Sequence, residues 1–253
     1  MSATGPARLS RETTVRSWLG PLAFWPGFVL WTTLMTAALL VLLPLPYGRR
    51  LAFTRYWSRF NIWWIRVTLG IRHRVHGLEH VPDGPVVVLC KHQSTWETLV
   101  LQDILPPQVW VLKRELLWIP VIGWGFALTG AIALDRRRGK AAVQKLLERG
   151  TARLKAGHSV LIFPEGTRIP VGQRGRFKIG GALLATHAGV PVLPVAHNAG
   201  YLWPRHGWRK WPGTVDLVIG PPVDTTGLEP EEVNRRVQEW IEARVEALGP
   251  PKD

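Results

Sequence analysis

Residues 86–97 read VVVLCKHQSTWE, a pattern in which a buried strand runs into a short polar loop and then a helix. Five apolar residues form the strand, and Ser94 or Thr95 is placed to cap the helix. His92 therefore precedes the helix start, and Glu97 falls in the first turn. Loops at the carboxyl ends of strands are where α/β domains carry their sites, so this segment is the first candidate.

The pairing of His92 with Glu97 has two interpretations. A carboxylate that orients an imidazole and stabilises its protonated form makes that imidazole a general base. The positive end of the helix dipole also favours the neutral, proton-accepting form of His92. However, Ser94–Glu97 is equally a capping box, in which Glu97 bonds back to the backbone of Ser94. These residues alone leave both interpretations open.

Beyond this segment, short apolar runs alternate with helical stretches. Apolar stripes at helical spacing predict one helix after Gly139, ending near Gly157, and a last helix over about residues 230–248. This alternation predicts an α/β domain whose layered sheet is mixed or mostly parallel and is flanked by helices. The predicted strands cover residues 74–77, 86–90, 109–113, 131–135, 160–163, 191–196 and 215–219.

Composition narrows the class of partner. The chain has 253 residues, and 32 Lys and Arg against 18 Asp and Glu give it a net charge of +14. This excess favours an anionic partner: a membrane surface, a phosphorylated substrate, an acidic carrier protein or nucleic acid. The single cysteine, Cys90, excludes an internal disulfide framework and fits a reducing compartment. No clustered Cys and His or HExxH motif occurs, so no metal and no cofactor are expected.

A long charge-free segment near the N-terminus predicts a membrane anchor. Ser17–Gly48 carries no charge and is long enough for a transmembrane helix. Arginines flank both ends, and such residues tend to stay cytoplasmic. Because Pro26-Gly27 interrupts the run, we expect a kinked hairpin that dips into one leaflet, and a single span is the alternative. The expected division is a membrane-anchoring helical segment, 1–70, followed by an α/β domain, 71–253.

Aromatic residues and arginines then mix between residues 51 and 71, as in a segment that lies in a membrane interface. Six of the 14 tryptophans precede residue 65. A platform for single-stranded nucleic acid would combine the same residue types. That interpretation gives the charge-free run no use, so the membrane is favoured and no nucleic acid is expected.

A second informative stretch, residues 160–168, reads VLIFPEGTR. A buried strand enters a tight turn at Glu165-Gly166 and then presents Thr167 and Arg168. Glycine lets the backbone approach a ligand closely, and arginine can bind a phosphate in bidentate fashion. An ordinary turn with a surface arginine would explain any one of these residues, but it explains the whole string less well.

The motif HxxxxE at residues 92–97, followed by FPEGTR at 163–168, resembles the glycerolipid acyltransferase superfamily, close to the bacterial 1-acyl-sn-glycerol-3-phosphate acyltransferases. Residues 130–136 resemble the family's second block, and residues 190–195 resemble its proline-containing block. The resemblance covers about residues 77–219 in the family's order. One departure is Glu97, which stands where the family usually has aspartate and is one methylene longer.

The resemblance implies an acyltransferase of phospholipid biosynthesis. A fatty acyl group would pass from acyl-CoA or acyl-carrier-protein to the sn-2 hydroxyl of lysophosphatidic acid, giving phosphatidic acid. His92 would deprotonate that hydroxyl while Glu97 holds the ring, with no acyl-enzyme. The acceptor's phosphate would bind Arg136 and Arg168, with Lys113 as a further candidate.

The FPEGTR turn would complete the substrate site, with Gly166 and Thr167 in contact and Glu165 orienting an arginine or the acceptor's hydroxyl. The basic loop 203–211 would rest on anionic headgroups or be an ordinary exposed turn. The protein is thus expected on the cytoplasmic face of the inner membrane, as an integral monotopic or single-span protein. Two alternatives remain: the same chemistry on glycerol 3-phosphate or a lysophospholipid, or a non-catalytic basic membrane-binding protein.

Overall fold

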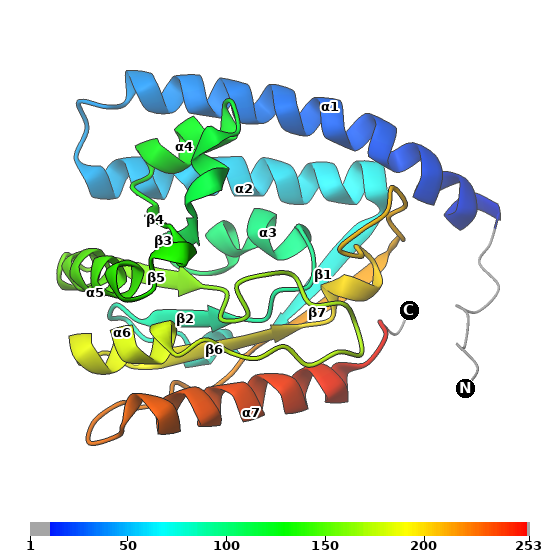
Figure 1. The fold of residues 1–253 in the computed structure, drawn as a ribbon. Coiled ribbons are helices and arrows are strands. Elements are labelled where there is room, and N and C mark those ends of the chain that lie inside the picture. Colours follow the sequence, from blue (N-terminus) through cyan, green and yellow to red (C-terminus); the bar gives the residue numbers. More distant parts are fainter. Residues whose placement is uncertain (1–10, 252–253) are drawn as a thin grey trace.

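The computed structural model describes residues 11–251, so residues 1–10 of the predicted N-terminal segment lie outside it. One mixed sheet of seven strands is covered by helices on both faces (Figure 1). The strand order is β1-β7-β6-β2-β5-β3-β4. The strands are β1 (Ile71–His76), β2 (Val87–Cys90), β3 (Gln108–Lys113), β4 (Ile132–Leu134), β5 (Ser159–Ile162), β6 (Val192–His197) and β7 (Gly213–Ile219).

Five neighbouring strands, β6, β2, β5, β3 and β4, run parallel to one another. β7 is antiparallel to β6, and β1 pairs parallel to β7. Each predicted strand overlaps an observed one, so the predicted mixed α/β sheet is confirmed. The parallel set matters for function, because the carboxyl ends of its strands all meet at one edge of the sheet.

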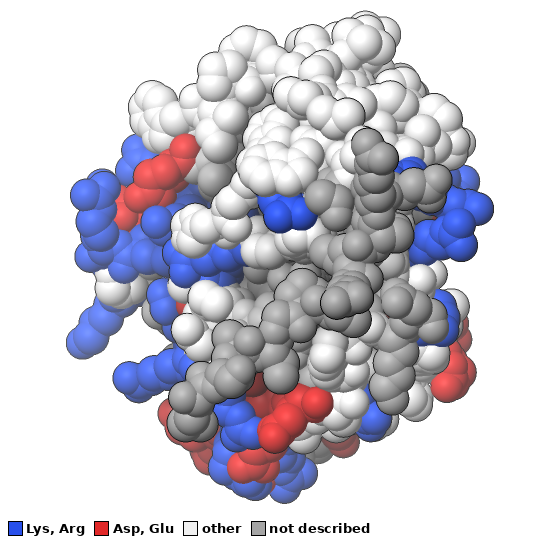
Figure 2. Space-filling view, turned by 90° about the vertical axis from the view of Figure 1, so that its right-hand side faces the viewer, with Lys and Arg blue, Asp and Glu red and all other residues white. Residues whose placement is uncertain are grey.

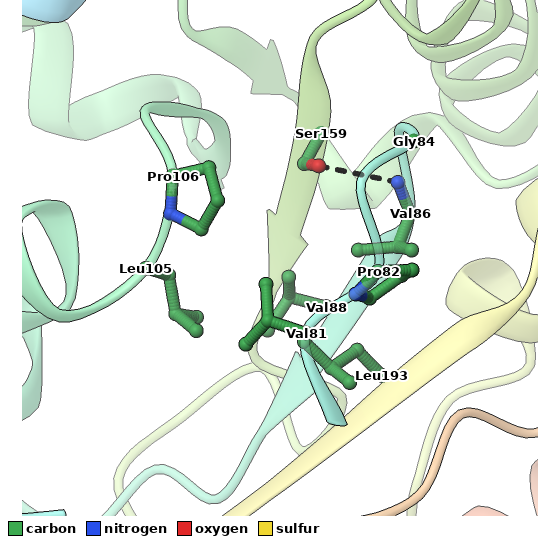
Figure 3. Close-up of a pocket in the computed structure, with 9 residues that line it drawn as sticks. All are labelled: Val81, Pro82, Gly84, Val86, Val88, Leu105, Pro106, Ser159 and Leu193. Atoms are coloured by element: carbon green, nitrogen blue, oxygen red, sulfur yellow. Dashed lines mark hydrogen bonds between the residues drawn. The ribbon is translucent and has the colours of Figure 1, made fainter. Parts of the chain in front are cut away.

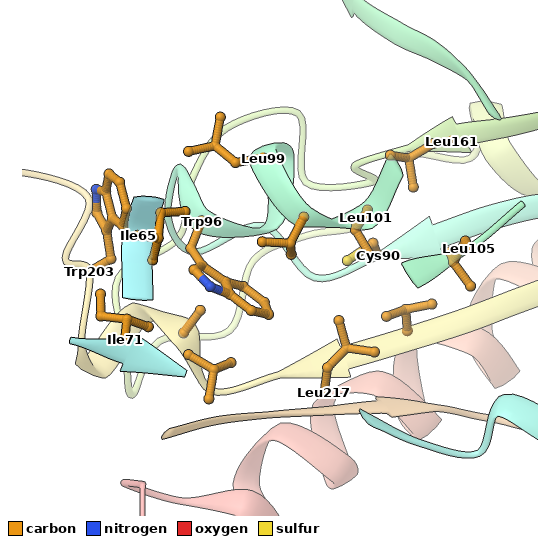
Figure 4. Packing of buried hydrophobic residues seen from close by; sticks show 14 of the residues in the cluster. Ile65, Ile71, Cys90, Trp96, Leu99, Leu101, Leu105, Leu161, Trp203 and Leu217 are labelled. Atoms are coloured by element: carbon orange, nitrogen blue, oxygen red, sulfur yellow. The ribbon is translucent and has the colours of Figure 1, made fainter. Parts of the chain in front are cut away.

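Successive residues of β2 face opposite sides of the sheet, as strand geometry requires. Val87 and Leu89 contact the core beneath the C-terminal helices, whereas Val88 and Cys90 contact the core beneath the N-terminal ones. Figure 4 shows the core beneath the N-terminal helices, where Trp96 is packed against the sheet.

The helices are α1 (Arg11–Val41), α2 (Tyr47–Leu69), α3 (Trp96–Ile104), α4 (Ile122–Leu128), α5 (Lys140–Lys155), α6 (Gly180–Ala188) and α7 (Pro230–Leu248), with short 3-10 turns η1 (Leu78–His80), η2 (Arg114–Trp118), η3 (Arg136–Arg138) and η4 (Ala199–Tyr201).

The two long N-terminal helices form an antiparallel pair above α3 (Figure 1). The predicted break at Pro26-Gly27 is wrong, because α1 continues through both residues and the chain turns between α1 and α2 instead. Gly27 allows α1 to pack closely against α2, because an added Cβ would collide with the indole of Trp64. The Nε1 of this indole donates to the carbonyl of Phe24 (3.1 Å). Among the described residues, one helical stretch, Val15–Val41, is long and apolar enough to cross a membrane, and about a third of it is buried in the protein.

Candidate active site

The sequence motifs meet at the carboxyl edge of the five parallel strands. His92 follows β2, the FPEGTR turn follows β5, and Arg136 follows β4. The backbone N–H of Ile169 donates to the carbonyl of His92 (2.8 Å), which joins the first two of these loops directly. Segments more than 70 residues apart in the chain therefore build one site.

Glu97 both orients the histidine and caps the helix. Its Oε1 lies 2.9 Å from Nδ1 of His92 and accepts the backbone N–H groups of Gln93 and Ser94, each at 2.8 Å. The hydroxyl of Ser94 donates to the other carboxylate oxygen and accepts the N–H of Trp96 (3.0 Å), whereas Thr95 at the N-cap position makes no side-chain capping bond. The two interpretations of this stretch are thus both realised in the geometry.

A proton on Nδ1 of His92, facing Glu97, leaves Nε2 as the basic nitrogen. The imidazole stacks on Phe163, with ring centroids 4.1 Å apart, so its plane is held from the side as well. The side chain is 14% exposed, which leaves it open to a substrate. A base that is oriented, held and reachable is what proton abstraction from a hydroxyl requires.

A second histidine, His197 at the end of β6, lies behind this pair and was not predicted as a site residue. Its buried ring donates from Nε2 to the carbonyl of Lys91 (2.8 Å) and accepts the N–H of Ala199 at Nδ1 (3.2 Å). Burial lowers the pKa of His197, although the facing Glu97 acts to raise it. Burial alone would raise the pKa of Glu97, but the facing His197 and the hydrogen bonds from His92 and Ser94 lower it to about 2.

We predict that Glu97→Gln lowers turnover about 10²-fold. The amide oxygen can still accept the backbone N–H groups, but a neutral side chain no longer stabilises the protonated imidazole of His92. Glu97→Asp keeps the charge and should retain more activity than Glu97→Gln. The measurement is the initial rate of acyl transfer beside thermal unfolding; full activity of the Gln variant would reduce Glu97 to a helix cap.

A buried ion cluster lies beneath the site. Lys91 has no exposed side-chain surface, and its Nζ lies 2.6 Å from Oε1 of Glu242 on α7 and 3.2 Å from Oε1 of Glu165. Burial raises the pKa of Glu165 to about 7, although Lys91 acts to lower it. The cationic partner of Glu165 is thus a lysine and not the expected arginine. The buried Oε2 of Glu165 has no hydrogen-bond partner among residues 11–251, so the role of Glu165 toward the acceptor's hydroxyl stays a prediction.

Two cations lie beside Gly166, and a third, Lys113, lies near one of them, Lys178. Arg136 donates from Nη1 to the carbonyl of Gly166, whose φ of 70° suits glycine. A Cβ at this position would lie 2.6 Å from Nη1 of Arg136 and 3.3 Å from Nζ of Lys178. Burial, and then repulsion by Arg136 and Lys113, lowers the pKa of Lys178. Lys178 was not predicted as a site residue, and a cluster of like charges of this kind suits an anionic group.

The other predicted binding residues lie at the border of the site. Thr167 is exposed, and Arg168 is partly exposed on the side of the loop 203–211. Burial, and then repulsion by Arg168, lowers the pKa of Lys210 in that loop to about 8. Among residues 11–251, no group of three or more His, Cys, Asp or Glu could hold a metal ion.

The basic loop 203–211 does more than form an exposed turn. Its Trp208 donates from the indole Nε1 to the carbonyl of Trp18 in α1 (2.9 Å), and Arg209 donates to Oγ of Ser17 (3.1 Å). Lys210 is buried and donates to the carbonyl of Gly207 (2.8 Å). The loop therefore fastens the start of α1 to the catalytic edge, while Arg205 and His206 remain exposed.

A small apolar hollow lies at the opposite edge of the sheet (Figure 3). It is bordered by Val86, just before β2, and by Ser159, which begins β5 and accepts the N–H of Val86 at its hydroxyl (3.1 Å). Both residues lie at the amino ends of strands whose carboxyl ends carry the motifs. This hollow is therefore not part of the candidate active site.

The sequence and the fold of this chain resemble those of known acyl-transferring enzymes. The sequence model of the family described as Acyltransferase matches residues 72–198. A 1-acyl-sn-glycerol-3-phosphate acyltransferase of Pseudomonas aeruginosa is 50% identical over 210 residues, which cover 81% of this chain and 82% of that protein. The human 1-acyl-sn-glycerol-3-phosphate acyltransferase alpha is 36% identical over 172 residues, 67% of this chain and 61% of its own length.

A solved structure extends the likeness from the sequence to the fold. The crystal structure of the 1-acyl-sn-glycerophosphate (LPA) acyltransferase PlsC from Thermotoga maritima matches with a TM-score of 0.80 at 26% identity, covering 95% of this chain and 99% of that one. The chain belongs to the Acyltransferase family. It is an O-acyltransferase, and the resemblance seen in the sequence is confirmed.

Proposed function

We propose that this enzyme transfers a fatty acyl group from a thioester donor, acyl-CoA or acyl-carrier-protein, to the sn-2 hydroxyl of lysophosphatidic acid. The observation that carries the proposal is the placing of an oriented base, His92, at the same sheet edge as Arg136 and Lys178. The names of the relatives support the same acceptor. The product would be phosphatidic acid.

In the proposed reaction, Nε2 of His92 takes the proton of the sn-2 hydroxyl as its oxygen attacks the thioester carbonyl. Glu97 stabilises the imidazolium that forms. The tetrahedral intermediate then expels the thiolate, which receives the proton from His92. The ester and the free thiol are the products, no acyl-enzyme is formed, and His92 returns to its starting state.

We infer that the acceptor's phosphate binds to Arg136 and Lys178, with Lys113 nearby. Lys178→Ala should raise the KM for lysophosphatidic acid about 10- to 100-fold, because a hydrogen bond to a charged group is worth about 1.5–3 kcal/mol. The KM for an uncharged 1-acylglycerol should change little. Arg137→Ala is the matched control, since its side chain is 87% exposed. An equal rise in KM for both acceptors would show that Lys178 does not bind the phosphate.

We further propose that the segment 1–70 anchors the enzyme to the cytoplasmic face of the inner membrane and that residues 71–253 form the acyltransferase domain. α1 provides the apolar length, and the arginines of α2 would meet anionic headgroups. Protease treatment of sealed inverted and right-side-out vesicles tests the orientation. Cleavage of the N-terminus from the periplasmic side alone would exclude a hairpin with both ends cytoplasmic.

The activity itself is tested with purified protein, an oleoyl thioester and three acceptors: lysophosphatidic acid, glycerol 3-phosphate and a zwitterionic lysophospholipid. The proposal expects the highest kcat/KM with lysophosphatidic acid and a product acylated at sn-2. A higher value with either other acceptor would reassign the acceptor while leaving the base in place. Comparing the CoA and carrier-protein thioesters in the same assay identifies the donor.

A further inference from the structure

The connection between β3 and β4 exposes large apolar side chains at the catalytic edge. Residues 116–134 carry no charged residue. Within this stretch Trp118 is 76% exposed and Trp124 is 59% exposed, and Ile119 is also exposed. Clustered exposed apolar residues of this size are typical of an interaction surface.

This connection lies against α1. α4 contacts α1 (Figure 1), and the hydroxyl of Thr36 donates to the carbonyl of Val121 (3.4 Å). α1 also exposes apolar residues near this contact, including Leu34 and Val41. Figure 2 shows the upper part of the molecule, where Figure 1 places α1, free of charged residues, with Lys and Arg gathered below it. Two segments distant in the sequence therefore share one apolar surface.

The charges beside this surface indicate its partner. Arg114 begins η2 with half of its side chain exposed, and Arg138, which faces the same Asp135, is more than half exposed. An apolar surface with basic residues at its border fits an anionic lipid bilayer, because tryptophan prefers the interface and arginine meets the headgroups. A second copy of this chain would instead bring two basic borders together.

The connection also reaches the base through aromatic contacts. Phe126 of α4 contacts Trp110, and Trp110 contacts Phe163, each with ring centroids 6.2 Å apart. Phe163 in turn stacks on His92. Val121, between the two exposed tryptophans, has a φ of 66°, a strained conformation for a β-branched residue. The exposed tryptophans are thus carried by a segment with a fixed relation to the site.

We propose that residues 114–128 form a second lipid-inserting element, with Trp118 and Trp124 in the interfacial region of an anionic bilayer beside α1. This inference rests on the proposed function and adds to it the surface that faces the lipid. Seating this element in the bilayer places the carboxyl edge of the sheet at the membrane, where a lysolipid acceptor resides.

The buried Cys90 makes a direct test possible, because it is the single cysteine and is shielded from labelling reagents. An environment-sensitive nitrobenzoxadiazole label is attached to Trp118→Cys and, separately, to Trp124→Cys. The matched control is Leu78→Cys, an apolar position on η1 that is 53% exposed and lies at the opposite edge of the sheet. Unsubstituted protein, treated identically, checks that Cys90 stays unlabelled.

The labelled proteins are added to vesicles of phosphatidylglycerol and phosphatidylcholine, with and without doxyl-labelled lipids. We expect a blue shift and at least twofold quenching by doxyl lipid at positions 118 and 124, and no such response at 78. A solvent-like label at 118 and 124, while a label at Leu30→Cys in α1 is quenched, would overturn the proposal. So would a shift that depends on protein concentration without vesicles, which would indicate contact between copies. Because no substrate is present, the result is independent of whether lysophosphatidic acid is the acceptor.

Discussion

His92→Ala is expected to lower the turnover of acyl transfer by about 10²- to 10⁴-fold, the usual contribution of a positioned general base. No other imidazole can take over, because the nearby His197 is buried and both of its ring nitrogens are hydrogen-bonded. The measurement is the initial rate with an oleoyl thioester and lysophosphatidic acid, beside circular dichroism and thermal unfolding. His187→Ala, an exposed histidine of α6, is the matched control.

The result separates two classes of protein. Undiminished turnover in His92→Ala would rule out His92 as the general base. Loss of turnover with an intact fold would exclude the alternative in which His92 and Glu97 only stabilise a membrane-binding protein. A variant that fails to fold is replaced by His92→Asn, which keeps a planar side chain beside Phe163.

Lys91→Met is expected to lower the free energy of unfolding by about 3–5 kcal/mol, the usual cost of removing one partner of a buried ion pair. The substitution would leave Glu165 and Glu242 buried without their cation. Equilibrium unfolding of the detergent-solubilised protein measures the change. Wild-type stability in this variant would contradict the inference that the cluster is charged.

Neutralising the whole cluster provides the control. The variant Lys91→Met/Glu165→Gln/Glu242→Gln leaves no uncompensated charge, so it should recover part of the stability lost in Lys91→Met. Glu242→Gln alone should cost less than Lys91→Met, because Lys91 keeps its contact with Glu165. These comparisons distinguish the loss of a charge partner from the loss of packing volume.

Features encoded within a few neighbouring residues were predictable from the sequence. Apolar runs identified all seven strands, and an apolar stripe over residues 230–248 identified α7 with the observed bounds. The meeting of His92 with the FPEGTR turn followed from the rule that parallel strands end at one edge. The rule that proline and glycine interrupt a helix failed at Pro26-Gly27. There α1 is continuous, and Gly27 packs closely against Trp64.

The residues that sequence reasoning missed depend on distant partners. Lys91 gives no sign of burial in its own neighbourhood, since its partner Glu242 lies 151 residues away. Lys178 precedes α6, and only the fold places it beside Gly166, where its backbone N–H donates to the carbonyl of Pro164 (3.0 Å). His197 is different, because it ends a strand whose carboxyl edge carries the site. The rule that selected His92 could therefore have selected His197 as well.

The joint between α2 and β1 has a consequence for how the enzyme meets its substrate. Gly70 is the single residue between them, and Ile65 and Leu69 belong to the same core as Trp96. Arg16 of α1 donates to the carbonyl of Arg66 near this joint (3.0 Å). The single-residue connection, the shared core and the Arg16 hydrogen bond therefore hold the N-terminal helices against the sheet. On a membrane, the height of the base above the lipid would be set once, by the architecture, and a lysolipid would find it by a two-dimensional search within the leaflet.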